Sequence, residues 1–262
     1  MSYSANFLAR IAVRQILATT FFDNIKAIVC VIALVLLSTT AQAQRVSPMV
    51  FELEPTGSQS ATSLRVENNK EEAMTVEFIA TKINLDEYGN ETRTPADEDF
   101  LIYPPQALIQ SGKAQVVKVK YVGDPVITES TAYRVSVNQL AVQSDDPSFQ
   151  GIGVLVNFNT LVNVSPLDSK PELAVSQIKA VADDKWELLI ENTGNRFCRF
   201  SKTTWEIKST VDPNNVHSLG QQEVGQLLDK NLIVPNSKLR VTIPAIEGFD
   251  PTQTSISISS DT

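Results

Sequence analysis

Short stretches in which apolar and polar residues alternate follow one another along most of this chain. From Ser47 onward they are separated by polar turn clusters, and none of them has the three-to-four-residue spacing of an amphipathic helix. Alternation with a period of two is typical of β-strands that bury one face. The pattern therefore predicts an all-β fold of the sandwich class.

The most informative stretch covers residues 151–166. In an extended strand, its polar face would carry Asn157, Asn159 and Asn163, and its apolar face Ile152, Val154, Val156, Phe158, Thr160 and Val162. Two interpretations are open. The strand is either central and buried within a sandwich, or it is an edge strand that offers Ile152, Val154 and Val156 to another polypeptide.

A proline-bracketed segment, 165–171, interrupts the series of strands. It is too short to be a flexible tether, so we expect a stiff elbow between two domains. The strand pattern restarts after it, which predicts an N-terminal domain over 44–165 and a C-terminal domain over 166–262. Trp186 and Trp205 are predicted to lie in the core of the second domain.

Three local features refine the expected strands. Pro104 and Pro105 cannot continue a central strand and indicate an edge or a switch between sheets. Residues 92–99 are predicted to form a polar loop. The apolar positions in 226–234 are predicted to belong to a strand of the second domain.

The N-terminus has the organisation of a secretory signal peptide. Arg10, Arg14 and Lys26 precede an apolar run over 27–37, and Ala41-Gln42-Ala43 forms a small-x-small cleavage site. The apolar run is too short to span the roughly 30 Å hydrocarbon layer as a helix, so no permanent membrane anchor is predicted. We expect cleavage after Ala43 and export of the mature chain.

The mature chain is acidic. Without residues 1–43, it keeps 19 Lys and Arg (22 minus 3) and 29 Asp and Glu (30 minus 1), a formal charge near −10. Nucleic acids and anionic membranes select basic surfaces, so this balance argues against both as partners.

Few residues suit catalysis. Cys30 leaves with the signal peptide, so Cys198 has no disulfide partner and is predicted to be a buried, inert thiol. His217 is the only histidine and lies in a predicted loop. The chain has no metal-ligand cluster, GxSxG motif or phosphate-binding glycine loop, so an enzyme has little support and no cofactor, metal or catalytic residue is predicted.

Two exported sandwiches joined by a proline-bracketed elbow resemble the periplasmic pilus-assembly chaperones of the PapD-like family. The resemblance covers essentially the whole mature chain. The motifs that carry it are Ser47-Pro48-Met49-Val50-Phe51, Leu64-Arg65-Val66-Glu67-Asn68, Ile102-Tyr103-Pro104-Pro105 with the Ser111-Gly112 turn, residues 133–142, residues 153–166, and Trp186-Glu187-Leu188-Leu189-Ile190-Glu191-Asn192-Thr193-Gly194.

The resemblance implies two immunoglobulin-like β-sandwich domains in an L shape and a function in the periplasm. The last strand of the first domain would be lent to pilus or fimbrial subunits that lack the final strand of their own sandwich. Aligned back from Pro166, the donor positions fall on Ile152, Val154 and Val156, with Phe158 next. An outer-membrane usher is a further implied partner, and a self-capping dimer is an option between clients.

One feature departs from the family and indicates a divergent branch. Its members hold the subunit's C-terminal carboxylate with a basic pair, and here the corresponding positions are Pro48 and Leu161, which carry no charge. Arg134 is our replacement candidate for a carboxylate anchor, with a solvated surface arginine as the alternative interpretation. Arg45 is a second candidate, although chain ends are often disordered.

A different class of function also fits the sequence. An exported structural or adhesive pilus-associated protein would use the long strand internally. That alternative predicts Ile152, Val154 and Val156 buried within the monomer, whereas a chaperone would present them to a client.

Overall fold

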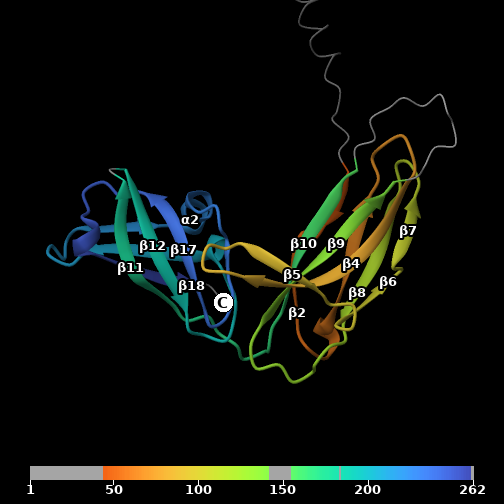
Figure 1. Ribbon diagram of the computed structural model, residues 1–262, viewed down its shortest axis with the longest axis horizontal. Helices are drawn as coiled ribbons and strands as arrows, with labels where there is room; N and C mark the ends of the chain where they lie inside the picture. The colour runs from red at the N-terminus through yellow and green to blue at the C-terminus, as the bar shows by residue number, and fades with distance from the viewer. Residues whose placement is uncertain (1–43, 142–154, 183, 261–262) are drawn as a thin grey trace, which may run out of the picture. The chain divides into compact units, whose positions relative to one another are not determined.

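The computed structural model describes residues 44–141, 155–182 and 184–260 (Figure 1). The predicted signal peptide and the predicted donor positions Ile152 and Val154 lie outside these residues. Among the described residues, no helix has both the length and the apolar character needed to cross a membrane.

The first group of strands forms two sheets that face each other across one core. One sheet has the order β1 (Arg45–Ser47), β3 (Ala61–Glu67), β8 (Ala114–Tyr121) and β6 (Phe100–Tyr103). The other has the order β2 (Val50–Leu53), β10 (Asn157–Val164), β9 (Thr131–Leu140), β4 (Met74–Leu85) and β5 (Glu91–Pro95), and β7 (Gln106–Ile109) also pairs with β4. The chain passes from the first sheet to the second between β6 and β7, at Pro104 and Pro105, where an edge or a sheet switch was predicted.

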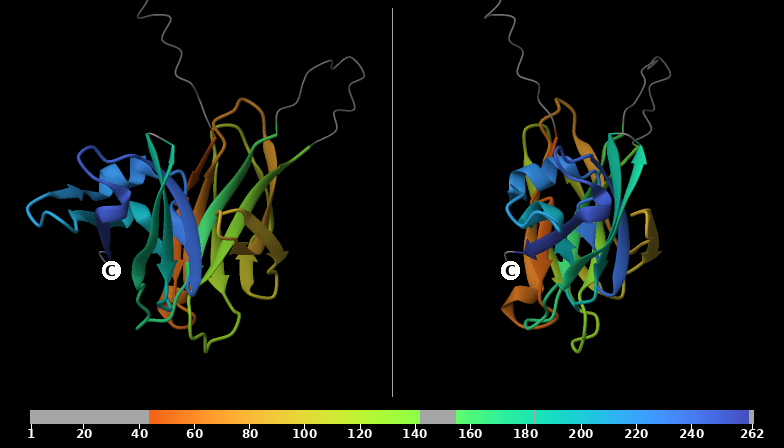
Figure 2. Two further views of the ribbon diagram at one scale, coloured as in Figure 1. Left: turned by 60° about the vertical axis from the view of Figure 1, so that its left-hand side comes forward. Right: turned by 90° about the vertical axis from the view of Figure 1, so that its left-hand side faces the viewer.

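The second group of strands follows the proline-bracketed segment. Its sheets are β11 (Leu173–Ala182), β12 (Lys185–Asn192) and β17 (Ser237–Pro244); β13 (Cys198–Arg199) and β16 (Leu232–Ile233); and β15 (Val216–Leu219), β14 (Thr203–Ser209) and β18 (Thr254–Ser260). In Figure 2 the first group is coloured orange to green and the second teal to blue. Within the described chain, no strand of one group pairs with a strand of the other.

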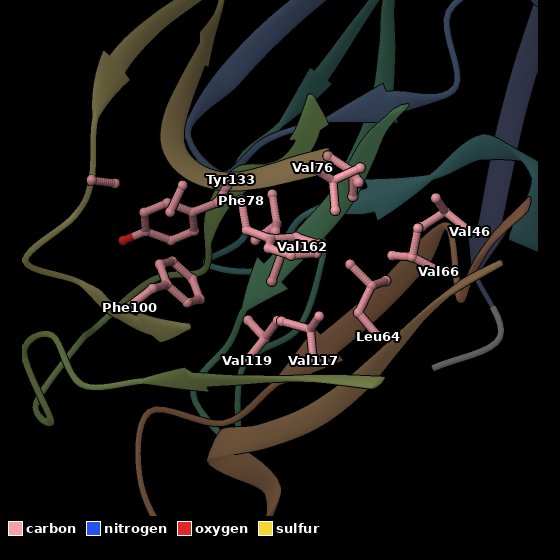
Figure 3. Packing of buried hydrophobic residues seen from close by; sticks show 14 of the residues in the cluster. Val46, Leu64, Val66, Val76, Phe78, Phe100, Val117, Val119, Tyr133 and Val162 are labelled. Atoms are coloured by element: carbon pink, nitrogen blue, oxygen red, sulfur yellow. The ribbon is translucent and has the colours of Figure 1, made fainter. Parts of the chain in front are cut away.

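Alternation along each strand builds the core of the first group. In β8, Val117, Val119 and Tyr121 are buried, whereas Lys118 and Lys120 are exposed. The same rule brings apolar side chains inward from both sheets (Figure 3). Aromatic rings close one end of the core, where those of Phe100 and Tyr133 meet edge to face at 4.9 Å between centroids.

The second group has its own core, and it contains both tryptophans. Trp186 is 3% exposed and Trp205 1% exposed, so the prediction that they are core residues is confirmed. The ring of Phe200 meets that of Trp205 edge to face at 6.2 Å between centroids. The core is thus filled by large rings packed against aliphatic strand residues.

Residues 92–99 do not form the predicted loop throughout, because β5 occupies Glu91–Pro95 and pairs with the end of β4. The Asp86 side chain closes the turn between the two strands by accepting the backbone N–H groups of Tyr88 and Asn90, each at 2.8 Å. The polar sequence of β5 is explained by its exposure, since four of its five residues face solvent.

The strand predicted over 226–234 is wrong in its first half. A short helix, α2 (Gln221–Leu227), ends there, and only Leu232–Ile233 are extended as β16. Val224 and Leu228 are four residues apart and both buried, so one face of the helix packs against the core. The carboxylate of Glu223 accepts the Gly220 N–H at 2.7 Å and satisfies one donor at the helix start.

Candidate functional site: an open strand edge

Strand β10 has two neighbours along only half of its length. It pairs antiparallel with β9 from Asn157 to Val164, but it pairs in parallel with β2 only from Leu161 to Val164. Figure 1 shows β9 and β10 side by side in the first group. The half of β10 from Asn157 to Thr160 is therefore an edge of the sheet within the described chain.

The hydrogen bonds show which backbone groups face that edge. The carbonyl of Val156 accepts the Gln139 N–H at 3.4 Å. The backbone N–H and C=O groups of the even-numbered residues therefore point toward β9. The Leu161 N–H instead donates to the Met49 carbonyl at 2.9 Å, so the backbone groups of the odd-numbered residues point to the side on which β2 lies. Asn157 and Asn159 are odd-numbered and lie beyond the pairing with β2, so their backbone groups point to the open edge.

The side chains of β10 form one apolar row. Thr160, Val162 and Val164 are fully buried, and Phe158 is partly buried against the core of the first group. Val156 is half-buried and continues the row beyond the strand, whereas its neighbour Leu155 is 50% exposed. Of the four predicted donor positions, the structure thus describes Val156 and Phe158, and both are on this row.

The opposite face of the open half is held by polar contacts. The side-chain oxygen of Asn159 accepts hydrogen bonds from Arg93 Nη1 at 3.0 Å and from Ser136 Oγ at 2.7 Å. The side-chain oxygen of Asn157 accepts the Gln139 N–H at 3.3 Å. The asparagines that make this face polar therefore fix the strand to β9 and β5.

Arg134, the candidate carboxylate anchor, is already ion-paired. Its Nη2 lies 2.6 Å from Glu91 Oε2, and Arg93 Nε lies 2.6 Å from Glu91 Oε1. Partial burial opposes ionisation of Glu91, but hydrogen bonds from the two arginines outweigh it and hold the pKa of Glu91 below its ordinary value. Two guanidinium groups share one carboxylate, which leaves one positive charge uncompensated in this cluster.

The other anchor positions have different environments. Arg45 is exposed in β1, opposite Glu67 of β3. Leu161 is 9% exposed and belongs to an apolar cluster with Ile83 and Ala132. A charge at position 161 would be placed among apolar side chains, so the site does not suit a basic residue.

The residues considered for catalysis are not brought together. Cys198 is 4% exposed, and burial raises the pKa of its thiol to about 11, with nearby Arg199 opposing the shift. His217 is exposed in β15 rather than in a loop. In the part of the chain that the structure describes, no three His, Cys, Asp or Glu residues are grouped as metal ligands would be.

Sequence comparison identifies no relative: no protein-family model and no curated protein matches this chain. Solved structures do match it in fold. The class 5 fimbriae chaperone CfaA is 15% identical, with 84% of this chain and 100% of that chain covered and a TM-score of 0.54. A chain of the chaperone–tip adhesin complex of CFA/I fimbriae is 15% identical, with 82% and 98% covered and a TM-score of 0.53.

A third match comes from Salmonella enterica. A chain of the complex between SafA pilin and the SafB chaperone is 11% identical, with 79% of this chain and 87% of that chain covered and a TM-score of 0.51. At these identities the similarity shows the fold. The chain has the two-sandwich, all-β fold of fimbrial chaperones, and the predicted resemblance and fold class are confirmed at this level.

Proposed function

We propose that this protein is a chaperone that binds incomplete pilus or fimbrial subunits by lending them the open edge of β10. The observation that carries the proposal is the free half of this strand. There, the backbone groups of Asn157 and Asn159 face an edge that β2 does not cover. An added strand from a subunit would pair with these groups.

The apolar row supplies the side-chain part of the proposed interaction. Val156 extends the row beyond Phe158, and from sequence alternation alone Val154 and Ile152 would continue it. A subunit that lacks its last strand exposes an apolar groove between two unpaired strand edges. Burying one such side chain in the groove would contribute roughly 1.5–3 kcal/mol before ordering costs, while backbone pairing fixes direction and register.

The rest of the proposal follows from the sequence. The chain would be exported to the periplasm with a signal peptide cleaved after Ala43, and 44–165 and 166–262 would be its two domains. An outer-membrane usher would receive the complex, and a second copy of the chain could cap the edge between clients. Like other chaperones, the protein would act by binding rather than by catalysis.

Arg134 remains our candidate for holding a client carboxylate, now together with Arg93. Because Glu91 neutralises only one of the two guanidinium groups, one positive charge is left beside the open half of β10. A carboxylate placed there would share the arginines with Glu91. Arg45 in β1 is the second candidate.

The proposal is tested by capture of a subunit. The mature chain is co-expressed in the periplasm with pilin-like subunits encoded beside its gene, and complexes are recovered by pull-down. We expect a one-to-one complex with the unmodified chain. Val156→Glu and Val154→Glu should each lower capture at least about tenfold, because a charge would have to enter an apolar groove.

Leu155→Glu is the matched control, since it adds the same charge at an exposed neighbouring position. It should capture subunits as well as the unmodified chain. Equal capture by Val156→Glu and Leu155→Glu would show that the proposed register is wrong. A stable monomer that captures no subunit, with or without substitutions, would favour the alternative of a structural or adhesive pilus-associated protein.

A further inference from the structure

Strand β17 of the second group is the last strand of its sheet. It pairs with β12 along all of Ser237–Pro244, and the sheet order β11, β12, β17 ends with it in the described chain. Backbone groups alternate in direction along such a strand, so half of the β17 residues face β12 and half face outward. An uncovered edge of this length could pair with a strand from another chain.

The tip of the β4–β5 hairpin, which belongs to the first group, covers this edge. The Arg240 N–H donates to the Glu87 carbonyl at 2.7 Å and therefore points away from β12. The Arg240 guanidinium is ion-paired with the carboxylate of Glu87, and its Nη1 lies 2.9 Å from Glu187 Oε1 on β12. Glu87 thus contacts both the backbone and the side chain of one edge residue.

The turn at the hairpin tip is built for a close approach. The Asp86 carbonyl accepts the Gly89 N–H at 2.9 Å, and its carboxylate accepts the Asn90 side-chain amide at 2.8 Å. Gly89 has a φ of 72°, in the left-handed region that favours glycine. A Cβ at Gly89 would lie 3.1 Å from Lys230 Cδ and 3.3 Å from Leu239 Cδ1. Glycine is therefore required both by the turn and by its neighbours in the second group.

The stem of the hairpin adds apolar contacts. Ile83 of β4 is buried in a cluster with Ala132 and Leu161 of the first group. Leu232 and Val234 of the second group pack against the same cluster. The hairpin is therefore held to the second group by apolar packing along its stem and by polar contacts at its tip.

Two strand edges of this chain are in opposite states. The backbone groups of Asn157 and Asn159 in β10 are left uncovered, whereas the chain covers the edge of β17 itself. We propose that the β4–β5 hairpin is an internal cap that keeps the β17 edge closed to strands of other chains. Strand pairing between chains is thereby directed away from the second group. The proposal does not rest on the proposed chaperone function, because its evidence comes from β17 and the hairpin.

The test displaces the tip of the hairpin with Gly89→Val in the mature chain. The valine side chain would meet Lys230 and Leu239 and would strain a backbone of positive φ. Hydrogen exchange followed by NMR should show the Arg240 amide exchanging at least about tenfold faster than in the unmodified chain. The Val241 amide faces β12 and should keep its rate. This pair of amides distinguishes local uncovering of the edge from unfolding of the domain.

Gly112→Val is the matched control. Gly112 has a φ of 66° in the turn between β7 and β8, and a Cβ there would meet no described atom within 4 Å beyond its chain neighbours. The control therefore strains a turn without disturbing the second group, and the Arg240 amide should change by less than about twofold. Equal acceleration in both variants would overturn the proposal. So would an Arg240 amide that exchanges without protection in the unmodified chain.

Glu87→Gln keeps the proposal testable if Gly89→Val does not fold. It removes the ion pair with Arg240 and keeps the carbonyl that accepts the Arg240 N–H. Exchange of the Arg240 amide should rise about threefold, as expected for loss of a partly exposed ion pair. Glu191→Gln is its control, because it removes the ion pair with Lys238 on the same strand without touching the hairpin. The same exchange rate in both variants would contradict a cap at Glu87.

Self-association measures the consequence of an uncovered edge. Sedimentation velocity should show Gly89→Val forming oligomers at a concentration at least about tenfold lower than Gly112→Val does. Faster exchange at Arg240 with no rise in self-association would show that the hairpin does not protect the edge, and would overturn the proposal. Subunit capture by Val156→Glu reports on β10, so failure of one proposal is distinguishable from failure of the other.

Discussion

The two halves of β10 have different surroundings. Leu161 to Val164 lie between β9 and β2, and all four residues are buried. Asn157 to Thr160 have β9 on one side only, and Asn157 and Asn159 are exposed. Asn157 to Thr160 are also more polar than Leu161 to Val164, although asparagine occurs in both halves. The difference is set by where β2 begins, because Pro48 and Met49 precede it and leave β10 to continue alone.

One strand can thus contribute to the stability of the fold through its buried half and to the proposed binding of a subunit through its open half. The buried half ties β10 into the core, which holds the free half in an extended conformation with its backbone groups aligned. Pairing with a further strand at the free half would then cost little ordering of this chain. A free strand edge is normally a liability because it can pair with other chains, so its retention requires a partner or protection.

The largest expected effect comes from placing a charge on the apolar row, once in the buried half of β10 and once at Val156, directly before the open half. Val162→Asp should lower the free energy of unfolding by about 4 kcal/mol or more, because Val162 is 0% exposed and a carboxylate there would have no partner. Val156→Asp should change it by less than about 1 kcal/mol, because Val156 is only half-buried. Urea unfolding followed by circular dichroism measures both. Similar losses in the two variants would mean that the halves do not differ as the structure indicates.

A proline substitution examines the backbone in the same way. Thr160→Pro removes an N–H that faces β9 and should cost about 3 kcal/mol or more. Asn157→Pro removes an N–H that faces the open edge, so the cost should stay near 1 kcal/mol. Thermal unfolding measures the stability of both variants, and the pull-down measures how much subunit each one captures. If Asn157→Pro folds and still captures subunits fully, the backbone of Asn157 does not take part in binding.

Much of the first group of strands could be predicted because its strands obey simple alternation. The buried positions of β8 and the apolar row from Phe158 to Val162 follow directly from a period of two. The proline pair at 104–105 gave a correct expectation of an edge or a sheet switch, since proline cannot donate to a ladder. The tryptophan core also follows from residue type alone.

The missed features depend on contacts between distant parts of the chain. Whether β10 is central or at an edge depends on the length of β2, about a hundred residues earlier, so the strand's own pattern left both interpretations open. The pairing of Arg134 with Glu91 depends on β5, which the polar sequence of 92–99 concealed. Helix α2 was missed because it has only seven residues and only one of them, Val224, is buried, so its sequence shows no helical period.

The smallest expected effect concerns the polar face of the open half, where Glu91 holds Arg93 and Arg134. The pKa of Glu91 is lower in the folded chain than its ordinary value of 4.5, so its ionised form stabilises the fold. This contribution is complete above about pH 4.5 and is lost as the pH falls through the lower pKa of the folded state. At pH 7, Glu91→Gln should therefore lower the free energy of unfolding by up to about 1 kcal/mol, as expected for a partly exposed ion pair.

Urea unfolding at several pH values between 7 and 3 measures this effect. The difference between Glu91→Gln and the unmodified chain should shrink as the pH falls below 4.5, because Glu91 is then protonated first in the unfolded chain and, at lower pH, in the folded chain as well. Glu98→Gln is the matched control, since Glu98 is exposed and forms no ion pair within the described chain. A difference for Glu91→Gln that persists unchanged at pH 3 would show that its side chain acts through shape or hydrogen bonding. The ion pair with Arg134 would then not be what positions the polar face of β10.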